Sequence, residues 1–282
     1  MLRILAFAKI NTYLCVVDKL PDGYHSLETV MQTVSLADEL QITPNNDGVI
    51  NFSCDNSELE KSDNLILKAC DLFFETTGFT GGFDIHLIKR IPVAAGLGGG
   101  SSDAAATLTA LNHIYNSPLK TTELERISLK LGADVPFFIR GGCSLAEGKG
   151  EVLTPIKKQS SFYYVLIKHG NKSSTKDMYT ALDTMQFEKK NETPDFMKLA
   201  NDYEYLCKMG YNDFLKVSTI DAKLQSDILA ASTTRFFLSG SGPSCYCVFD
   251  NLSSATAVYN ELKPKYEQCF LVEDTDAGSR IV

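Results

Sequence analysis

Residues 92–103 restrict what this chain can fold into more than any other segment. They read PVAAGLGGGSSD, with four glycines among the five residues 96–100, and an alanine-rich run that predicts a helix follows them. Glycine lets the backbone bend sharply and approach a ligand closely. A glycine loop at a helix N-terminus offers free N–H groups and the positive end of the helix dipole, which suits phosphate. We therefore predict a phosphate-binding loop; the alternative is a glycine-rich surface turn before an ordinary helix.

The two serines and the aspartate that end this segment lie where a helix N-cap belongs, and we expect an alanine-rich helix to follow them. Ala104, Leu108, Leu111 and Tyr115 then form one apolar stripe that anchors the helix on a core. The glycine spacing fits neither G-x-x-x-x-G-K-[ST] nor G-x-G-x-x-G. P-loop ATPases and Rossmann dehydrogenases are therefore disfavoured.

Composition sets the class of protein. The 282 residues are 44% hydrophobic and 22% charged, which is typical of a globular chain with one large or two ordinary cores. A net charge of −8 argues against nucleic acid as a partner and requires local positive charge wherever phosphate binds. No apolar run is long enough for a membrane span or a signal peptide, and none of the eight cysteines forms a C-x-x-C pair. We expect a cytoplasmic protein with reduced thiols, small-molecule partners and no membrane partner; the oligomeric state does not follow from the sequence.

The order of predicted elements indicates an α+β protein. Strands are predicted at residues 2–18, 30–36, 39–43, 83–89 and 143–147, and helices at 63–74 and 121–131. A second unit begins near residue 162 with a strand at 163–167. It ends in a strand at 235–238, a strand at 245–249, a helix at 253–266 and a strand at 269–273. This β-β-α-β ending predicts a mostly antiparallel sheet covered by helices.

Two further segments carry polar groups suited to a phosphate site. Lys9 and Asn11 lie on an otherwise apolar strand, where a lysine is costly to bury without an anionic partner; alone, it would more often protect a strand edge. Tyr24 and His25 follow a turn, where flat rings either stack on a base or simply pack. Residues 240–244, GSGPS, read as a hairpin loop or as a second loop that supports the first.

Asp134 is a candidate catalytic carboxylate. It lies in GADVP, residues 132–136, and we expect Pro136 to hold Val135 extended, so that the aspartate sits on a rigid bend. Such an aspartate often makes only a turn or a helix cap. Beside a lysine and a phosphate loop, it can instead deprotonate an alcohol.

Together these segments resemble the GHMP kinase superfamily, whose three motifs occur here in the right order at residues 8–11, 92–102 and 240–244. Within it, DGYH at residues 22–25 and GADVP at 132–136 resemble kinases that act on a cytidylyl derivative of methylerythritol. The resemblance implies a two-domain α+β fold with its domain boundary between residues 157 and 158. The N-terminal α/β domain would contain a left-handed βαβ unit like that of ribosomal protein S5, and the C-terminal domain an antiparallel sheet with helices.

The resemblance also implies the chemistry: transfer of the γ-phosphoryl group of ATP to the 2-hydroxyl of the methylerythritol unit. Asp134 would be the base and Lys9 its partner, which makes physical sense because a neighbouring ammonium favours the charged carboxylate. Asp63 and Asn64 would lie near the nucleotide. The loop that cradles the ATP phosphates would consist of Pro92, Val93, Ala94, Ala95, Gly96, Leu97, Gly98, Gly99, Gly100, Ser101 and Ser102.

The same resemblance assigns the cytidine diphosphate end of the substrate to Asn11, Tyr24 and His25. Mg²⁺ is expected to travel with ATP, because it prefers phosphate oxygens and keeps its waters. Two other readings stay open: a GHMP kinase for another alcohol, such as homoserine or phosphomevalonate, and a regulator that binds nucleotide without catalysis. The polar segment 170–177 is placed to cover the nucleotide through Ser174 or Thr175.

Overall fold

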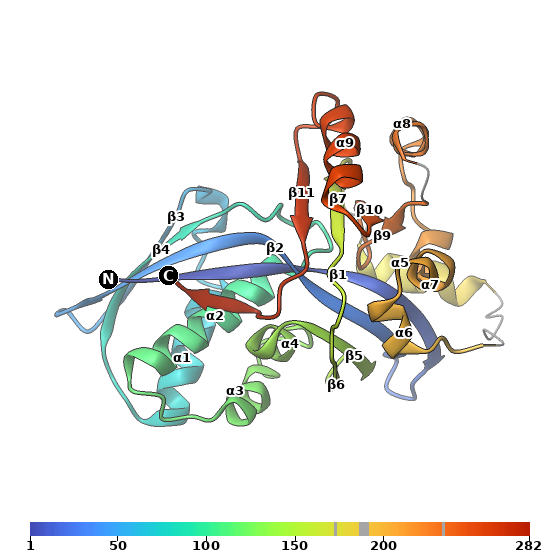
Figure 1. Ribbon diagram of the computed structural model, residues 1–282. Helices are drawn as coiled ribbons and strands as arrows, with labels where there is room; N and C mark the ends of the chain where they lie inside the picture. Colours follow the sequence, from blue (N-terminus) through green and yellow to red (C-terminus); the bar gives the residue numbers. More distant parts are fainter. Residues whose placement is uncertain (172–173, 186–191, 233–234) are drawn as a thin grey trace.

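The computed structural model describes residues 1–171, 174–185, 192–232 and 235–282. These residues form two sheets with helices packed on them, as Figure 1 shows, so the predicted α+β class is confirmed. The larger sheet consists of β1 (Leu2–Lys19), β2 (His25–Asn45), β3 (Ile50–Cys54), β4 (Gly82–Ile88), β5 (Cys143–Gly148), β6 (Val152–Ile156), β8 (Tyr211–Asn212) and β12 (Ser279–Ile281). The smaller sheet consists of β7 (Tyr163–Lys168), β9 (Phe237–Leu238), β10 (Ser244–Phe249) and β11 (Cys269–Glu273).

The helices fall into two groups along the chain, one before and one after residue 157. Those before residue 157 are α1 (Leu65–Thr77), α2 (Gly99–Ile114), α3 (Thr121–Ser128) and α4 (Val135–Arg140), with a short 3₁₀ helix η1 at Ser57–Leu59. Those after it are α5 (Thr175–Thr184), α6 (Phe196–Asn201), α7 (Tyr203–Met209), α8 (Ala222–Ala231) and α9 (Leu252–Leu262), with η2 at Asp213–Lys216. Within the described ranges, no helix is both long and apolar enough to cross a bilayer.

A long antiparallel hairpin of β1 and β2 forms the centre of the larger sheet. The sequence predicted two strands over residues 30–43, but the structure has one continuous strand, β2. The pairing shifts between Phe7, which faces Ala37, and Ala8, which faces Val34. The extra residues in β2 are therefore accommodated as a bulge, which bends a strand without ending it.

The strands β3 and β4 pair in parallel and are joined through α1, so a βαβ unit is present where the resemblance implies one. The handedness of that unit stays a prediction. Helix α1 begins at Leu65, because the Asn64 side chain caps it by accepting a hydrogen bond from the Ile66 N–H. Asn64 is thus a structural cap as well as a candidate nucleotide residue.

Helix α2 begins earlier than predicted. Its N-cap is Gly98, with φ of 72°, and its first residue is Gly99, so Ser101, Ser102 and Asp103 lie inside the helix and do not cap it. The left-handed backbone that glycine permits turns the chain into the helix and makes a side-chain cap unnecessary. The predicted apolar stripe is confirmed, because Ala104, Leu108 and Leu111 are buried and Tyr115 packs against the same core.

The smaller sheet has the order β11-β7-β10-β9, and all its pairs are antiparallel. The predicted β-β-α-β ending is therefore correct, with α9 between β10 and β11. Cys245 and Cys247 are free thiols in its core. The boundary between residues 157 and 158 stays a prediction; two short strands from beyond it, β8 and β12, pair with β1 in the larger sheet.

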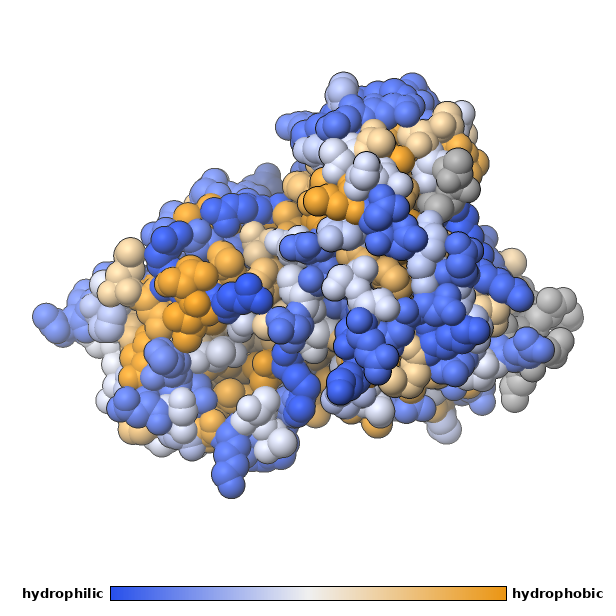
Figure 2. All heavy atoms as spheres, in the orientation of Figure 1, coloured by the Kyte–Doolittle hydropathy of each residue, from blue (hydrophilic) through white to orange (hydrophobic). Residues whose placement is uncertain are grey.

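Strand β12 brings the last described residues beside the first ones. Ile281 pairs with Ile4, and Figure 1 shows the two chain ends close together. In Figure 2, an apolar area lies on the left of the face shown, where Figure 1 places β12 and the chain ends, and hydrophilic residues cover much of the rest. Ile281 and Val282 are exposed there.

Candidate active site

A cleft of about 650 Å³ lies where β1, the glycine loop, the start of α4 and the loop after β9 meet. It brings together most of the residues singled out from the sequence, although they come from distant parts of the chain. Those that line it are Lys9, Asn11, Asp63, Asn64, Asp134 and all of residues 92–101. Ser102, Tyr24 and His25 are not among the lining residues.

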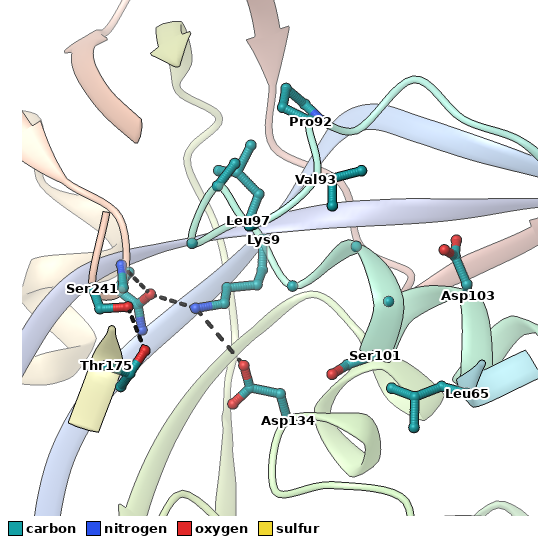
Figure 3. Close-up of a pocket in the computed structure, with 18 of the residues that line it drawn as sticks. Lys9, Leu65, Pro92, Val93, Leu97, Ser101, Asp103, Asp134, Thr175 and Ser241 are labelled. Carbon is teal, nitrogen blue, oxygen red and sulfur yellow. Dashed lines mark hydrogen bonds and ion pairs between the residues drawn. The ribbon is translucent and has the colours of Figure 1, made fainter. Parts of the chain in front are cut away.

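Lys9 projects from β1 into this cleft and toward Asp134, as Figure 3 shows. Its Nζ lies 2.6 Å from Asn11 Oδ1 and 4.0 Å from Asp134 Oδ2. The Lys9 side chain is 6% exposed, whereas that of Asp134 is 42% exposed. The cost of burying the ammonium is therefore offset by polar partners, and the carboxylate remains open to a ligand.

The position of Lys9 follows from irregularities in β1. The pairing with β2 shifts between Phe7 and Ala8 and again between Asn11 and Tyr13, so Lys9 and Asn11 lie on the short stretch between two shifts. Such irregularities re-aim side chains beside functional sites. The backbone N–H of Lys9 also donates to the Leu97 carbonyl at 3.0 Å, which ties this stretch to the glycine loop.

Asn11 holds the lysine in place. Its Oδ1 accepts hydrogen bonds from Lys9 Nζ and from the Gly240 N–H, at 2.6 and 2.9 Å. Its Nδ2 donates to Thr29 Oγ1 at 2.8 Å. The amide is therefore fixed with its oxygen toward the ammonium, and its assignment to the substrate stays a prediction.

Asp134 occupies the N-cap position of α4, but its side chain makes no capping hydrogen bond within the described structure. The expectation that Val135 is extended is wrong: Val135 is the first residue of α4, and Pro136 is the second. Proline fits the first turn of a helix, where no intrahelical N–H bond is lost. The result is a carboxylate at the mouth of the cleft, aimed at Lys9.

The glycine loop is shaped by close contacts. Gly96 and Gly98 have φ of 77° and 72°. A Cβ on Gly98 would lie 2.5 Å from the Phe138 ring, and one on Gly96 would collide with the Ser239 carbonyl oxygen. Side chains are excluded at both positions, so the main chain itself faces the cleft.

The first turn of helix α2, which follows this loop, has backbone N–H groups without a partner in the helix. The first intrahelical bond runs from the Ser102 N–H to the Gly98 carbonyl, at 2.9 Å. The N–H groups of Gly99, Gly100 and Ser101 precede it and have no partner within the helix. Three such groups at the positive end of a helix form an anion site. Ser102 itself is buried and donates its hydroxyl hydrogen to the Phe7 carbonyl at 2.6 Å.

The late GSGPS segment, together with Ser239 before it, supports the first loop. Ser239 Oγ donates to the Gly96 carbonyl at 3.0 Å, and the Ser244 N–H donates to the Ala95 carbonyl at 3.3 Å. Ser241 Oγ is 2.9 Å from Thr175 Oγ1 at the start of α5, as Figure 3 shows. Ser174 caps that helix, and residues 172–173 of the predicted covering segment lie outside the described residues.

Tyr24 and His25 lie beyond the edge of the cleft. Tyr24 is 62% exposed, and Lys149 Nζ lies 4.3 Å from the centre of its ring. His25 is buried, lies 2.7 Å from Asp183 Oδ1 through Nε2 and stacks on Tyr179, with ring centres 4.5 Å apart. Burial, aided by the charge of Asp134, raises the pKa of Tyr179 to about 12.

Tyr179 and Lys149 both line the cleft, and the sequence interpretation missed them. Lys149 stands between two glycines, in GKG at residues 148–150, which is a signal for an exposed turn that carries a cation. Tyr179 lies on α5, where nothing in the sequence distinguishes it from an ordinary packed aromatic residue.

The structure offers no protein-built metal site among the residues it describes, since no three His, Cys, Asp or Glu side chains gather in a suitable group. Asp103, expected to be a helix-cap charge, is instead buried in an ion pair with Lys89. The residues therefore do not fit a dedicated Mg²⁺ site.

Comparison with known proteins identifies the family. Residues 64–142 match the model of the GHMP kinases N terminal domain. The chain is 39% identical over 273 residues to the 4-diphosphocytidyl-2-C-methyl-D-erythritol kinase of Clostridium novyi (strain NT), covering 94% of this chain and 97% of that protein. The chain belongs to this kinase family. A family member from Clostridium botulinum (strain Loch Maree / Type A3) is 38% identical, with 94% and 97% covered.

Solved structures agree with this assignment. A crystal structure of 4-(cytidine 5'-diphospho)-2C-methyl-D-erythritol kinase superposes with a TM-score of 0.80 at 29% identity, covering 96% of this chain and 98% of that one. A homoserine kinase from Cytophaga hutchinsonii superposes with a TM-score of 0.76 at 16% identity, covering 100% and 97%. At that identity the second match shows the fold alone. Members of the GHMP kinase superfamily use ATP, so this chain is an ATP-dependent kinase.

Proposed function

We propose that this chain transfers the γ-phosphoryl group of ATP to the 2-hydroxyl of 4-diphosphocytidyl-2-C-methyl-D-erythritol, a step of isoprenoid precursor biosynthesis. The observation that carries the proposal is the approach of Lys9 Nζ to Asp134 Oδ2, 4.0 Å apart beside the donor-rich start of α2. Relatives that cover nearly the whole chain carry the name of this activity. A non-catalytic regulator has no need of a buried lysine aimed at an open carboxylate.

In this mechanism Asp134 accepts the proton of the substrate hydroxyl, and the hydroxyl oxygen then forms a bond to the γ-phosphorus as the bond to ADP breaks. Lys9 attracts the carboxylate across 4.0 Å and steadies the attacking oxygen. Because phosphoryl transfer needs charge stabilisation more than covalent help, the positions of these two groups matter most. Asn11 fixes Lys9 and so acts as a positioning residue.

The phosphates of ATP bind along residues 92–101, against the N–H groups of Gly99, Gly100 and Ser101. Asp63 and Asn64 also line the cleft and lie near the nucleotide, since Leu65, which follows them, lies nearest to a Cβ built on Gly100. Mg²⁺ travels with ATP and neutralises part of the phosphate charge when bound. We propose that the enzyme acts in the cytoplasm.

The cytidine end of the substrate binds near Tyr24, His25 and Tyr179. Support comes from Tyr179, whose ring lines the cleft and is backed by the stacked ring of His25, because a flat ring offers a face to a pyrimidine base. Lys149 also lines the cleft, and its Nζ pairs with Asp22 at 2.6 Å. That pair is exposed and therefore weak, so the ammonium is available to an anionic substrate.

The test is ADP release by the purified chain with Mg-ATP and each of three alcohols: 4-diphosphocytidyl-2-C-methyl-D-erythritol, homoserine and phosphomevalonate. ADP formed only with the cytidylyl substrate supports the proposal. ADP formed with another alcohol keeps the kinase but removes the assigned roles of Tyr24 and His25. No ADP with any of them overturns the proposed reaction.

A further inference from the structure

A buried cluster of one lysine and two carboxylates lies directly beneath the glycine loop. Lys89 Nζ is 2.8 Å from Asp103 Oδ2 and also pairs with Asp38 Oδ2. The side chains of Lys89, Asp38 and Asp103 are 9%, 0% and 5% exposed. A Cβ built on Gly99 would lie 2.9 Å from Lys89 Nζ. The ammonium therefore sits against the first residue of α2, where phosphate is proposed to bind.

The two carboxylates of this cluster are not equivalent. Asp38 Oδ1 accepts hydrogen bonds from the N–H groups of Arg90 and Ile91, at 2.6 and 2.8 Å. Asp103 Oδ1 is buried and has no hydrogen-bond partner among the described residues. N–H donors stabilise an ionised carboxylate, whereas a buried oxygen without a donor destabilises it. One ammonium balances one negative charge, so a neutral cluster holds one proton, and Asp103, whose Oδ1 has no donor, is the carboxyl that takes it.

We propose that Asp103 holds a proton when nucleotide is bound, and that the Asp38–Lys89–Asp103 cluster thereby makes ATP binding dependent on proton uptake. The inference rests on the proposed binding of the ATP phosphates at the start of α2. With both carboxylates ionised, the cluster carries one net negative charge beneath those phosphates and repels them through a poorly solvated interior. With Asp103 protonated, the cluster is neutral and the helix N-terminus acts alone.

The surroundings of Asp103 agree with this assignment. Burial raises the pKa of Asp103 to about 8; the charge of Lys89 opposes this shift, and the charge of Asp38 adds to it. Asp55 lies on the far side of Lys89, where it accepts the Lys89 backbone N–H at 2.9 Å. On α1, which packs along α2, burial raises the pKa of Cys70 to about 12, so that thiol stays neutral. Asp103 therefore titrates in a pH range in which ATP binding can be measured.

The experiment is ATP binding to the whole protein by calorimetry, without the second substrate, between pH 7.5 and 9.5. In this range the terminal phosphate, with a pKa of about 6, is already ionised. We expect the Kd for ATP of the wild type to rise by about tenfold or more, since only the protonated form binds well. Asp103→Asn, which mimics the neutral carboxyl, should keep the wild-type Kd at pH 7.5 and change little up to pH 9.5. Asp71→Asn, on the exposed side of α1, is the matched control and should keep the wild-type slope.

A second measurement needs no variant. At pH 8.5, the heat of ATP binding to the wild type should differ between buffers of high and low ionisation enthalpy by the amount expected for net proton uptake. A Kd that does not change with pH, an equal slope in Asp103→Asn, or no proton uptake overturns this inference and leaves the proposed kinase intact. Failure of ATP to bind at pH 7.5 overturns both.

Discussion

Lys9 and Asp134 come from a strand at one end of the sequence and a short helix near its middle, and their charged atoms lie 4.0 Å apart. The lysine is fixed from behind by Asn11, whereas the aspartate is exposed to the cleft. The pair thus has one rigid and one accessible member. This arrangement suits a base that must reach a hydroxyl beside a fixed positive charge.

Replacing the base should abolish turnover without preventing nucleotide binding. Asp134→Asn removes the proton acceptor but keeps the size of the side chain, so we expect kcat to fall by roughly 10² to 10⁴. Calorimetry with ATP should give a Kd close to that of the wild type. Wild-type turnover in this variant would remove Asp134 from the mechanism.

Replacing Asn11 separates two roles for that residue. If it positions Lys9, Asn11→Ala should lower kcat by about 10², because a small displacement of a catalytic group is costly. The KM for the cytidylyl substrate should then change little. A large rise in that KM with kcat retained would show that Asn11 binds substrate, as the resemblance implies. Lys9→Ala, assayed in parallel, should lower kcat at least as far.

Gly98→Ala tests the shape of the phosphate loop. The new Cβ would meet the Phe138 ring at 2.5 Å and would occupy a backbone with φ of 72°. We expect the KM for ATP to rise, because the loop must shift. Gly78→Ala is the matched control, since its φ is also 72° and nothing lies within 4 Å of the added Cβ. It should cost about 1 kcal/mol of stability and leave KM unchanged; equal effects of both variants on KM would contradict the prediction.

Tyr179→Ala tests the pyrimidine end of the cleft. Stacking of a base on an aromatic ring contributes about 1–3 kcal/mol. The KM for the cytidylyl substrate should therefore rise by about tenfold, with the KM for ATP unchanged. Tyr179→Phe keeps the ring and should restore most of the affinity. A rise in the KM for ATP instead would move the base pocket away from α5.

Asp103 should also make stability depend on pH. Its pKa is about 8 in the folded protein and about 4 when unfolded, so between these values the folded state binds the extra proton. Stability should therefore fall as pH rises from about 4 to 8, and this contribution should be absent in Asp103→Asn. Urea midpoints at pH 5 and pH 9 for both proteins measure it. The same midpoint difference in both would show that Asp103 is not the group responsible.

Local patterns were enough to find the motifs of this site. The glycine run, the buried lysine of β1 and Asp134 were all identified from their neighbours in sequence, and the structure places them along one cleft. The predicted start of α2 was wrong, because the positive φ of Gly98 begins the helix without the expected side-chain cap. The prediction that Val135 is extended was wrong, because Pro136 is the second residue of α4 and a proline in the first turn allows the residue before it to be helical.

Other features depend on contacts between distant residues and leave no local signal. The pairing of Asp103 with Lys89 requires the loop before α2 to fold back over that helix. The stack of Tyr179 on His25 requires α5 to lie across the end of the β1–β2 hairpin. Neither contact follows from composition or periodicity, because Lys89 and Tyr179, which complete the two pairs, look ordinary in their own segments.

The contact between the two glycine-containing loops is made mostly of main chain. Apart from the Ser239 hydroxyl, it consists of carbonyl oxygens and N–H groups around Gly96 and Ala95, with no space for an added side chain at Gly96. Apart from Ser239, such a contact depends on the path of the main chain and not on the identity of the surrounding side chains. Replacing side chains around this contact should therefore leave it intact, whereas any side chain at Gly96 should push the two loops apart.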